Sequence, residues 1–213
     1  MRTDDLIDLL ARHEPARPPR RGVSALLLSL ALAVPAATLL MAPLLGINPQ
    51  LRAYLALPMF WVKAGFGLAL AASAALLVLR LARPGVRAGA ARYAPAVPVL
   101  GLWLLALAAL VAAPAGRASE LVFGSSWRSC PPSILALSLP VLAGALLALR
   151  RMAPTQLAAA GAAAGLLAGG LGAAIYALHC PELAAPFLAT WYVVGALLPM
   201  ALGAWLGPRV LRW

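Results

Sequence analysis

The two cysteines of the chain are its strongest candidates for chemistry, and each stands in a short polar segment between long apolar runs. Cys130 closes the segment Ser-Trp-Arg-Ser-Cys at 126–130 and is followed by two prolines, which suit the first turn of a helix. Its sulfur would then lie near the positive end of a helix dipole, with Arg128 close by, and both influences favour the thiolate. Cys130 is therefore predicted to be a reactive thiol.

The second cysteine, Cys180, lies in the segment Tyr-Ala-Leu-His-Cys-Pro-Glu at 176–182, where His179 and Glu182 flank it. Thiolate, imidazole and carboxylate together suit zinc, cadmium or copper(I). Cys130 and Cys180 are therefore candidate metal ligands, with His179 and Glu182 as auxiliary ligands. No obligatory cofactor is expected, and the bound ion would be a transient heavy metal.

The residues alone leave three interpretations of the cysteine pair open. A structural disulfide requires Cα atoms within about 7 Å of each other in an oxidising compartment. A redox-responsive or metal-responsive pair requires the two thiols to act together. Two independent buried thiols would pack as small hydrophobic side chains and do nothing further.

The elements that must position these residues are membrane-spanning helices. Hydrophobic residues make up 63% of the 213 residues, against about 45–50% in a soluble domain. Six apolar runs are long enough to cross about 30 Å of hydrocarbon, and they predict helices at 23–45, 58–80, 94–113, 132–150, 157–178 and 187–207. The sequence thus predicts an all-α integral membrane bundle at 23–213, embedded in a lipid bilayer, with a tail at 1–22.

The arginines gather at alternate edges of the predicted spans. Thirteen fall on one side, before residue 22, between 80 and 92, at 150–151 and at 209–212, and three fall on the other, at 52, 117 and 128. The positive-inside rule therefore places both termini in the cytoplasm. The net charge of +11 is interpreted as a topology signal and an attraction for anionic lipid, not as a nucleic-acid surface.

Lys63, inside the second span, is expected to snorkel to the interface.

The fifth predicted span carries a stripe of small residues, with Gly161, Gly165 and Gly169 at every fourth position. Such a stripe lets another helix approach closely, which favours packing within the bundle, although a homodimer could use the same face. Tryptophans near span ends, Trp127 and Trp191 among them, are expected to anchor at the headgroup level. No catalytic motif accompanies these features, so the chain is not expected to be an enzyme.

The tail contains a short amphipathic segment at 3–12. It has a threonine N-cap, acids in the first turn and an arginine in the last, each of which favours a helix. One surface carries leucines and the other aspartates, and the segment is predicted to dock against another protein through Asp4, Asp5, Leu6, Ile7, Asp8, Leu9 and Leu10. A helix lying on the bilayer surface is less favoured, because acids are unhelpful beside anionic lipid.

Segments along the whole chain are similar to one known family. They are Thr-Asp-Asp-Leu-Ile at 3–7, Phe-Trp-Val-Lys at 60–63, Arg-Pro-Gly at 83–85, Ser-Trp at 126–127 leading to Cys130, Ala-Pro-Thr at 153–155, the 176–182 segment and Leu-Gly-Pro-Arg-Val-Leu-Arg-Trp at 206–213. In these segments the chain resembles the NrsF family of six-span bacterial membrane proteins. The resemblance implies an anti-sigma factor of the inner membrane, which holds an extracytoplasmic-function (ECF) sigma factor inactive and releases it under heavy-metal or oxidative stress.

The resemblance and the residue analysis together give one hypothesis and one alternative. In the hypothesis, Cys130 and Cys180 match the family's two responsive cysteines, and the tail segment at 3–12 holds the sigma factor. In the alternative, a small membrane transporter or thiol-redox protein uses the same cysteines, and the tail has no essential part.

Overall fold

The computed structural model describes residues 20–83, 85–114 and 116–212. The predicted docking segment, with Asp4, Asp5, Leu6, Ile7, Asp8, Leu9 and Leu10, lies outside these residues. Every regular element in the described chain is helical: α2 (Arg20–Leu45), α3 (Leu51–Tyr54), α4 (Pro58–Leu81), the 3₁₀ helix η1 (Gly89–Tyr93), α5 (Ala96–Val111), α6 (Ala118–Phe123), α7 (Cys130–Arg150), α8 (Leu157–Tyr176), α9 (Ala185–Phe187), the π-helical η2 (Leu188–Tyr192) and α10 (Val193–Val210).

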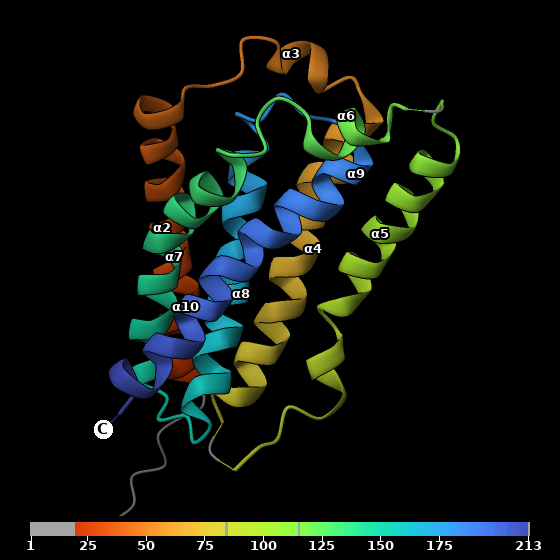
Figure 1. Ribbon diagram of the computed structural model, residues 1–213. Coiled ribbons are helices and arrows are strands. Elements are labelled where there is room, and N and C mark those ends of the chain that lie inside the picture. The colour runs from red at the N-terminus through yellow and green to blue at the C-terminus, as the bar shows by residue number, and fades with distance from the viewer. Residues whose placement is uncertain (1–19, 84, 115, 213) are drawn as a thin grey trace, which may run out of the picture.

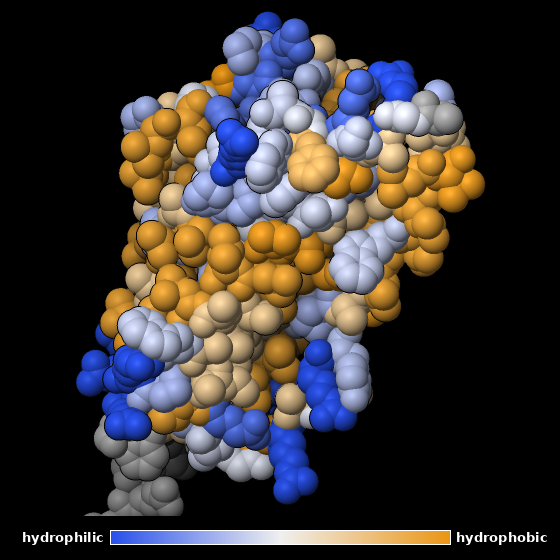
Figure 2. All heavy atoms as spheres, in the orientation of Figure 1, coloured by the Kyte–Doolittle hydropathy of each residue, from blue (hydrophilic) through white to orange (hydrophobic). Residues whose placement is uncertain are grey.

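Six of the described helical stretches are long and apolar enough to cross a membrane, which makes the chain a multi-pass membrane protein. The six predicted spans are confirmed, with shifts of a few residues at their ends. The fourth begins earlier than expected, so that Cys130 opens α7 and the two prolines after it occupy the first helical turn. The last is one continuous run of α9, η2 and α10. Figure 2 shows apolar side chains forming a band between polar groups at both ends of the molecule.

Helix α8 is the centre of the bundle. It packs against α10, α4 and α7, while α2 packs mainly on α7 and α5 contacts α9, α4 and η2 at one edge (Figure 1). The share of buried residues follows this order, since α8 is the most buried span and the span containing α5 is the least buried. The two peripheral helices, α2 and α5, therefore present most of the surface available to lipid.

Glycines bring α8 and α10 into backbone contact. A Cβ added at Gly161 would meet the carbonyl oxygen of Gly203, and one added at Gly165 would meet that of Pro199. At Gly169 it would lie 2.5 Å from the carbonyl oxygen of Ala196. The small-residue stripe is therefore used within the chain, as the favoured interpretation expects. The homodimer through Gly161, Gly165 and Gly169 is wrong, because α10 already covers all three.

The spans alternate in direction, so the bundle has two chemically different ends. One, which we name the arginine-rich end, holds the chain between α4 and α5, the chain between α7 and α8, and the C-terminus (Figure 1). Its described arginines are Arg20 and Arg21 at the start of α2, together with Arg80, Arg83, Arg87, Arg92, Arg150, Arg151, Arg209 and Arg212. The other, which we name the cysteine end, holds α3, α6, Cys130 and Cys180.

Candidate functional site

The two cysteines come together at the cysteine end although they lie fifty residues apart in the chain. Cys130 is the first residue of α7, and Cys180 lies in the segment that joins α8 to α9. Both thiols are free, both side chains are 0% exposed, and both belong to one contiguous hydrophobic core. They also lie within electrostatic range of each other and of the Lys63 ammonium. The arrangement is a buried pair of thiols with one cation beside it.

Lys63 supplies that cation from α4. Its side chain is 0% exposed, and its Nζ donates to the carbonyl oxygen of Cys180 at 2.7 Å and to that of Glu182 at 3.1 Å. The expectation that Lys63 snorkels to the interface is wrong, because these two carbonyls bind the ammonium inside the protein. A charge out of contact with water is stable only when it is paired or well hydrogen-bonded. Lys63 therefore holds the Cys180 segment against α4.

His179 and Glu182, the two predicted auxiliary metal ligands, are bonded to other groups. His179 Nδ1 donates to the carbonyl oxygen of Gly46 at 3.0 Å. Glu182 Oε1 accepts from the backbone N–H of Ser125 at 2.7 Å and from its hydroxyl at 2.6 Å. Among the described residues no three His, Cys, Asp or Glu side chains stand close enough to hold a metal ion. The predicted four-ligand metal group is therefore not assembled in this arrangement.

Gly124 makes the Glu182 contact possible. Its φ of +53° lies in a region that L side chains rarely adopt, and a Cβ built there would lie 2.7–2.8 Å from the Glu182 carboxylate. The carboxylate thus occupies the space where another residue would carry a side chain. Through Glu182, the Cys180 segment is bound to the loop that leads into Cys130.

Two tyrosines complete the surroundings of the thiols. Tyr176 ends α8 and Tyr192 ends η2, both are 0% exposed, and their ring centroids are 5.8 Å apart. The Tyr192 hydroxyl is buried next to the Cys180 side chain and has no nitrogen or oxygen partner among the described residues. Single π-helical turns inside α-helices occur frequently at functional sites, and here η2 carries Tyr192 to the thiols. An unpartnered buried hydroxyl is unusual in a native protein.

An aromatic cluster, which we define as Phe123, Trp127 and Trp191, lies beside the thiols at the same end. The rings of Trp127 and Trp191 are 5.1 Å apart, and Trp191 Nε1 donates to the carbonyl oxygen of Val122 at 2.8 Å. Trp127 and Trp191 therefore connect three elements: α6, the start of α7, and η2. They do more than anchor the protein at the membrane interface. The Arg128 guanidinium lies 5.0 Å from the Trp127 ring centroid and is exposed. The cation beside the thiols is thus Lys63, not the predicted Arg128.

Sequence reasoning found both cysteines but missed Lys63, Tyr176 and Tyr192 as their neighbours. The only lysine of the chain, placed inside an apolar run, was a signal, since charges within spans usually face a protein interior. The tyrosines gave no comparable signal, because aromatic residues are common near span ends.

Comparisons with known proteins bear on the whole chain. The family model described as "Negative regulator of sigma F" (NrsF) matches residues 10–213. The "Probable anti-sigma-F factor NrsF" of Azospira oryzae is 45% identical over 213 residues, and the "Anti-sigma-F factor NrsF" of Caulobacter vibrioides is 44% identical over 222 residues. In both cases the similarity covers 100% of each chain. No solved structure matches.

These comparisons confirm the resemblance that the sequence segments indicated. Both relatives are named as regulators, which agrees with the expectation of a protein that is not an enzyme. Because the family model covers nearly the entire chain and the relatives exceed 40% identity over their full lengths, the chain belongs to the NrsF family of negative regulators of sigma F.

Proposed function

We propose that the chain is a membrane anti-sigma factor that holds an ECF sigma factor of the sigma-F type at the membrane and releases it after a reaction at Cys130 and Cys180. The names of its relatives support the regulatory half of this proposal. The observation that carries the sensing half is the pair of free thiols that share one buried site with Lys63.

The membrane orientation follows from the arginines. Ten described arginines lie at the arginine-rich end, against three at the cysteine end, and lysine or arginine in short loops favours the cytoplasmic side. The arginine-rich end and both termini would then face the cytoplasm of a bacterial inner membrane. The thiols would lie on the periplasmic side, where disulfides form and persist.

Oxidation of the pair by a peroxide is the first reaction that the site allows. One cysteine, once deprotonated to the thiolate, attacks one peroxide oxygen and forms a sulfenic acid as the other oxygen leaves as water. The second thiol then attacks the sulfenic sulfur, a disulfide forms, and a second water leaves with the remaining proton. A thiophilic divalent ion is the second reactant, bound by both sulfurs with loss of two protons.

Both reactions require the site to open, because neither cysteine is exposed. Trp127 and Trp191 pack against the core that contains both cysteines. The segment 177–184, which carries Cys180, has no regular secondary structure beyond its turns. Loops of this kind open locally at a lower free energy than the helices they join. Reagents would therefore reach the thiols from the cysteine end.

Helix α7 offers a route from the thiols to the tail. Cys130 opens α7, and α2, which follows the tail directly, packs mainly on α7. The helices touch closely at two levels: a Cβ at Gly144 would lie 3.4 Å from Ser29, and one at Gly22 would lie 2.8 Å from Met152 just beyond α7. A shift of α7 would thus move the start of α2. A change in placement of the segment at 3–12 would follow, with loss of the sigma factor.

Affinity purification of the intact chain in a mild detergent, beside a version lacking residues 1–14, tests the partner. We expect mass spectrometry to find a sigma factor with the intact chain only. If neither preparation carries a sigma factor, the anti-sigma proposal fails, and metal flux into liposomes would test the transporter alternative.

The double variant Cys130→Ser with Cys180→Ser tests the sensor separately. We expect it to retain the sigma factor in the presence of peroxide or cadmium ion, while the wild-type chain releases it. The matched controls are the two single variants, of which neither can form the intramolecular disulfide. Normal release from the double variant would contradict the proposal that Cys130 and Cys180 sense the stress. The proposal that the chain binds a sigma factor would still stand.

A further inference from the structure

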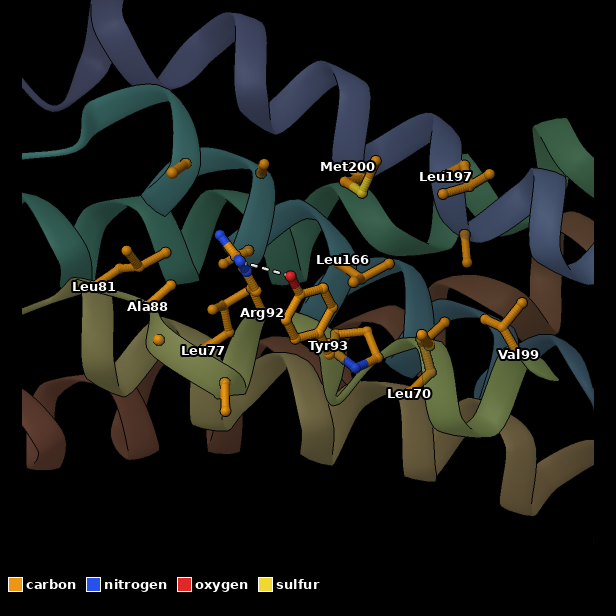
Figure 3. Close-up of a pocket in the computed structure, with 18 of the residues that line it drawn as sticks. Leu70, Leu77, Leu81, Ala88, Arg92, Tyr93, Val99, Leu166, Leu197 and Met200 are labelled. Carbon is orange, nitrogen blue, oxygen red and sulfur yellow. Dashed lines mark hydrogen bonds between the residues drawn. The ribbon is translucent and has the colours of Figure 1, made fainter. Parts of the chain in front are cut away.

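A cavity of about 990 Å³ lies between α4, α5, α8 and α10. Its wall comes from four elements: α4 with Leu70, Leu77 and Leu81, the η1 and α5 region, α8 with Leu166, and α10 with Leu197 and Met200. Figure 3 shows these apolar side chains around Arg92 and Tyr93. The volume is near the upper end of the roughly 300–1,000 Å³ typical of ligand pockets. The cavity can hold a substantial apolar ligand.

The cavity begins at the arginine-rich end and runs into the membrane-spanning region. Leu81 ends α4 and Leu70 lies eleven residues earlier in the same helix, and both line the cavity. At 1.5 Å per residue their separation is about 16 Å, roughly half of the hydrocarbon thickness. The side formed by α5 belongs to the least buried span of the bundle. The cavity thus has the depth of one bilayer leaflet and lies where lipid surrounds the protein.

The mouth of the cavity is cationic, and no carboxylate from the described residues lies at it. Arg87 and Arg92 line it and are exposed. The Arg92 guanidinium donates to the Tyr93 hydroxyl at 2.6 Å and lies 4.6 Å from the centroid of that ring, which holds it over the cavity (Figure 3). Within the described ranges the only carboxylates are Glu120 and Glu182, and both belong to the cysteine end. Both guanidinium groups are therefore available to an anion from outside the described part of the chain.

We propose that this cavity binds one anionic phospholipid from the leaflet at the arginine-rich end. The acyl chains lie against the leucines of α4, α8 and α10, and the phosphate lies at the mouth between Arg87 and Arg92. Guanidinium groups present several N–H donors in a plane that matches phosphate oxygens. Basic pockets between membrane helices on this side are a known type of site for anionic headgroups. A soluble anion would use the arginines and leave the apolar wall empty.

Native mass spectrometry of the full chain in a mild nonionic detergent tests the proposal. The probes are phosphatidylglycerol and phosphatidylcholine with the same acyl chains, and inorganic phosphate. We expect phosphatidylglycerol to be retained at least tenfold more than phosphatidylcholine, and phosphate to leave its retention unchanged. Equal retention of the two lipids, or displacement by phosphate, would overturn the proposal.

Three variants separate the charge from the apolar wall. Arg87→Gln with Arg92→Gln removes the cationic mouth, and we expect it to reduce retention of phosphatidylglycerol about tenfold. Ala162→Phe, at a partly exposed position in the wall, places a phenyl group where the acyl chains would lie and should reduce retention with both arginines present. Arg150→Gln, a matched control outside the cavity at the same end, should retain the lipid as the wild-type chain does.

Three results with these variants would overturn the proposal. One is equal loss in the Arg150→Gln control, which would show a general attraction of lipid to positive charge. The second is unchanged retention in the folded double arginine variant, which keeps a wild-type elution volume in size-exclusion chromatography. The third is a dimer that the wild-type chain forms and the double arginine variant does not, with no change in lipid content. This result would show that a second copy of the chain, not a lipid, occupies the cavity.

Discussion

The two ends of the bundle handle their polar groups in opposite ways. At the cysteine end Lys63, His179 and Glu182 are each bonded to groups from a distant part of the chain. At the arginine-rich end Arg87 and Arg92 are exposed and have no carboxylate partner among the described residues. The polar groups at the cysteine end are thus bonded within the protein, whereas the arginines at the arginine-rich end are free to bind an anion from the surroundings.

This difference separates stability from binding. Groups bonded within the protein contribute to folding, and their removal leaves buried partners unsatisfied. Exposed charges contribute little to folding but attract external anions. Substitutions at the cysteine end should therefore lower the free energy of unfolding, and substitutions at the arginine-rich end should change only what the protein binds.

Lys63→Met is expected to have the largest effect. The variant keeps the length of the side chain but leaves the carbonyl oxygens of Cys180 and Glu182 without their buried donor. Hydrogen bonds to a charged group contribute about 1.5–3 kcal/mol each, and relief of the buried charge offsets part of the loss. We expect the free energy of unfolding to fall by about 3 kcal/mol in a dodecyl sulfate titration monitored by tryptophan fluorescence.

The control for Lys63→Met is Ser73→Ala in the same helix. Ser73 is also buried, but its hydroxyl bonds only the carbonyl of Leu70 one turn earlier. A loss below about 1 kcal/mol is expected there. Equal losses in the two variants would show that Lys63 is an ordinary buried polar residue and not the tie between α4 and the Cys180 segment.

Gly124→Ala should have the next largest effect. The alanine must adopt a φ of +53°, and its methyl group would lie 2.7–2.8 Å from the carboxylate of Glu182. Strain of this kind costs on the order of 1–3 kcal/mol, so we expect a loss of about 2 kcal/mol in the same titration. Gly116→Ala is the matched comparison, because its φ is +89° with nothing near the added carbon. If Gly116→Ala loses as much, backbone strain alone accounts for the result.

Ser125→Ala should have a smaller effect. It removes the hydroxyl donor to Glu182 but keeps the backbone N–H donor at 2.7 Å. One hydrogen bond of this kind is worth about 1 kcal/mol. Thermal unfolding in detergent should show a modest decrease, and faster alkylation of the thiols by a maleimide should accompany it, since Glu182 joins the two cysteine-bearing segments. Unchanged alkylation would separate this contact from access to the thiols.

The fold was predictable because membrane spans depend on local sequence. Length and apolarity alone placed all six helices, and the spacing of Gly161, Gly165 and Gly169 marked the face that α10 covers. The third span begins five residues earlier than predicted, and this has a local reason too: η1 lies just before α5 and extends the apolar stretch to Gly89. A hydrophobic run of this kind can be recognised in the sequence without knowing which helices pack against it.

The site was less predictable because its contacts are distant in sequence. The bond between Lys63 and the Cys180 carbonyl joins residues 117 positions apart, and no local pattern specifies it. Proximity in sequence favoured Arg128 as the cation beside Cys130, yet that guanidinium lies over Trp127. Similarly, His179 and Glu182 flank Cys180 in the chain, but their side chains bond Gly46 and Ser125. Residue type was predictable, whereas the direction of each side chain was not.

The smallest effect on folding is expected at the arginine-rich end. Arg87→Gln with Arg92→Gln removes two exposed charges and one hydrogen bond to Tyr93, so the free energy of unfolding in neutral detergent should change by less than about 0.5 kcal/mol. With phosphatidylglycerol in the micelles, the wild-type chain should become more stable and the variant should not, because only a ligand bound to the folded state stabilises it. A large loss in neutral detergent would mean that the arginines act within the fold, and the contrast between the two ends would then fail.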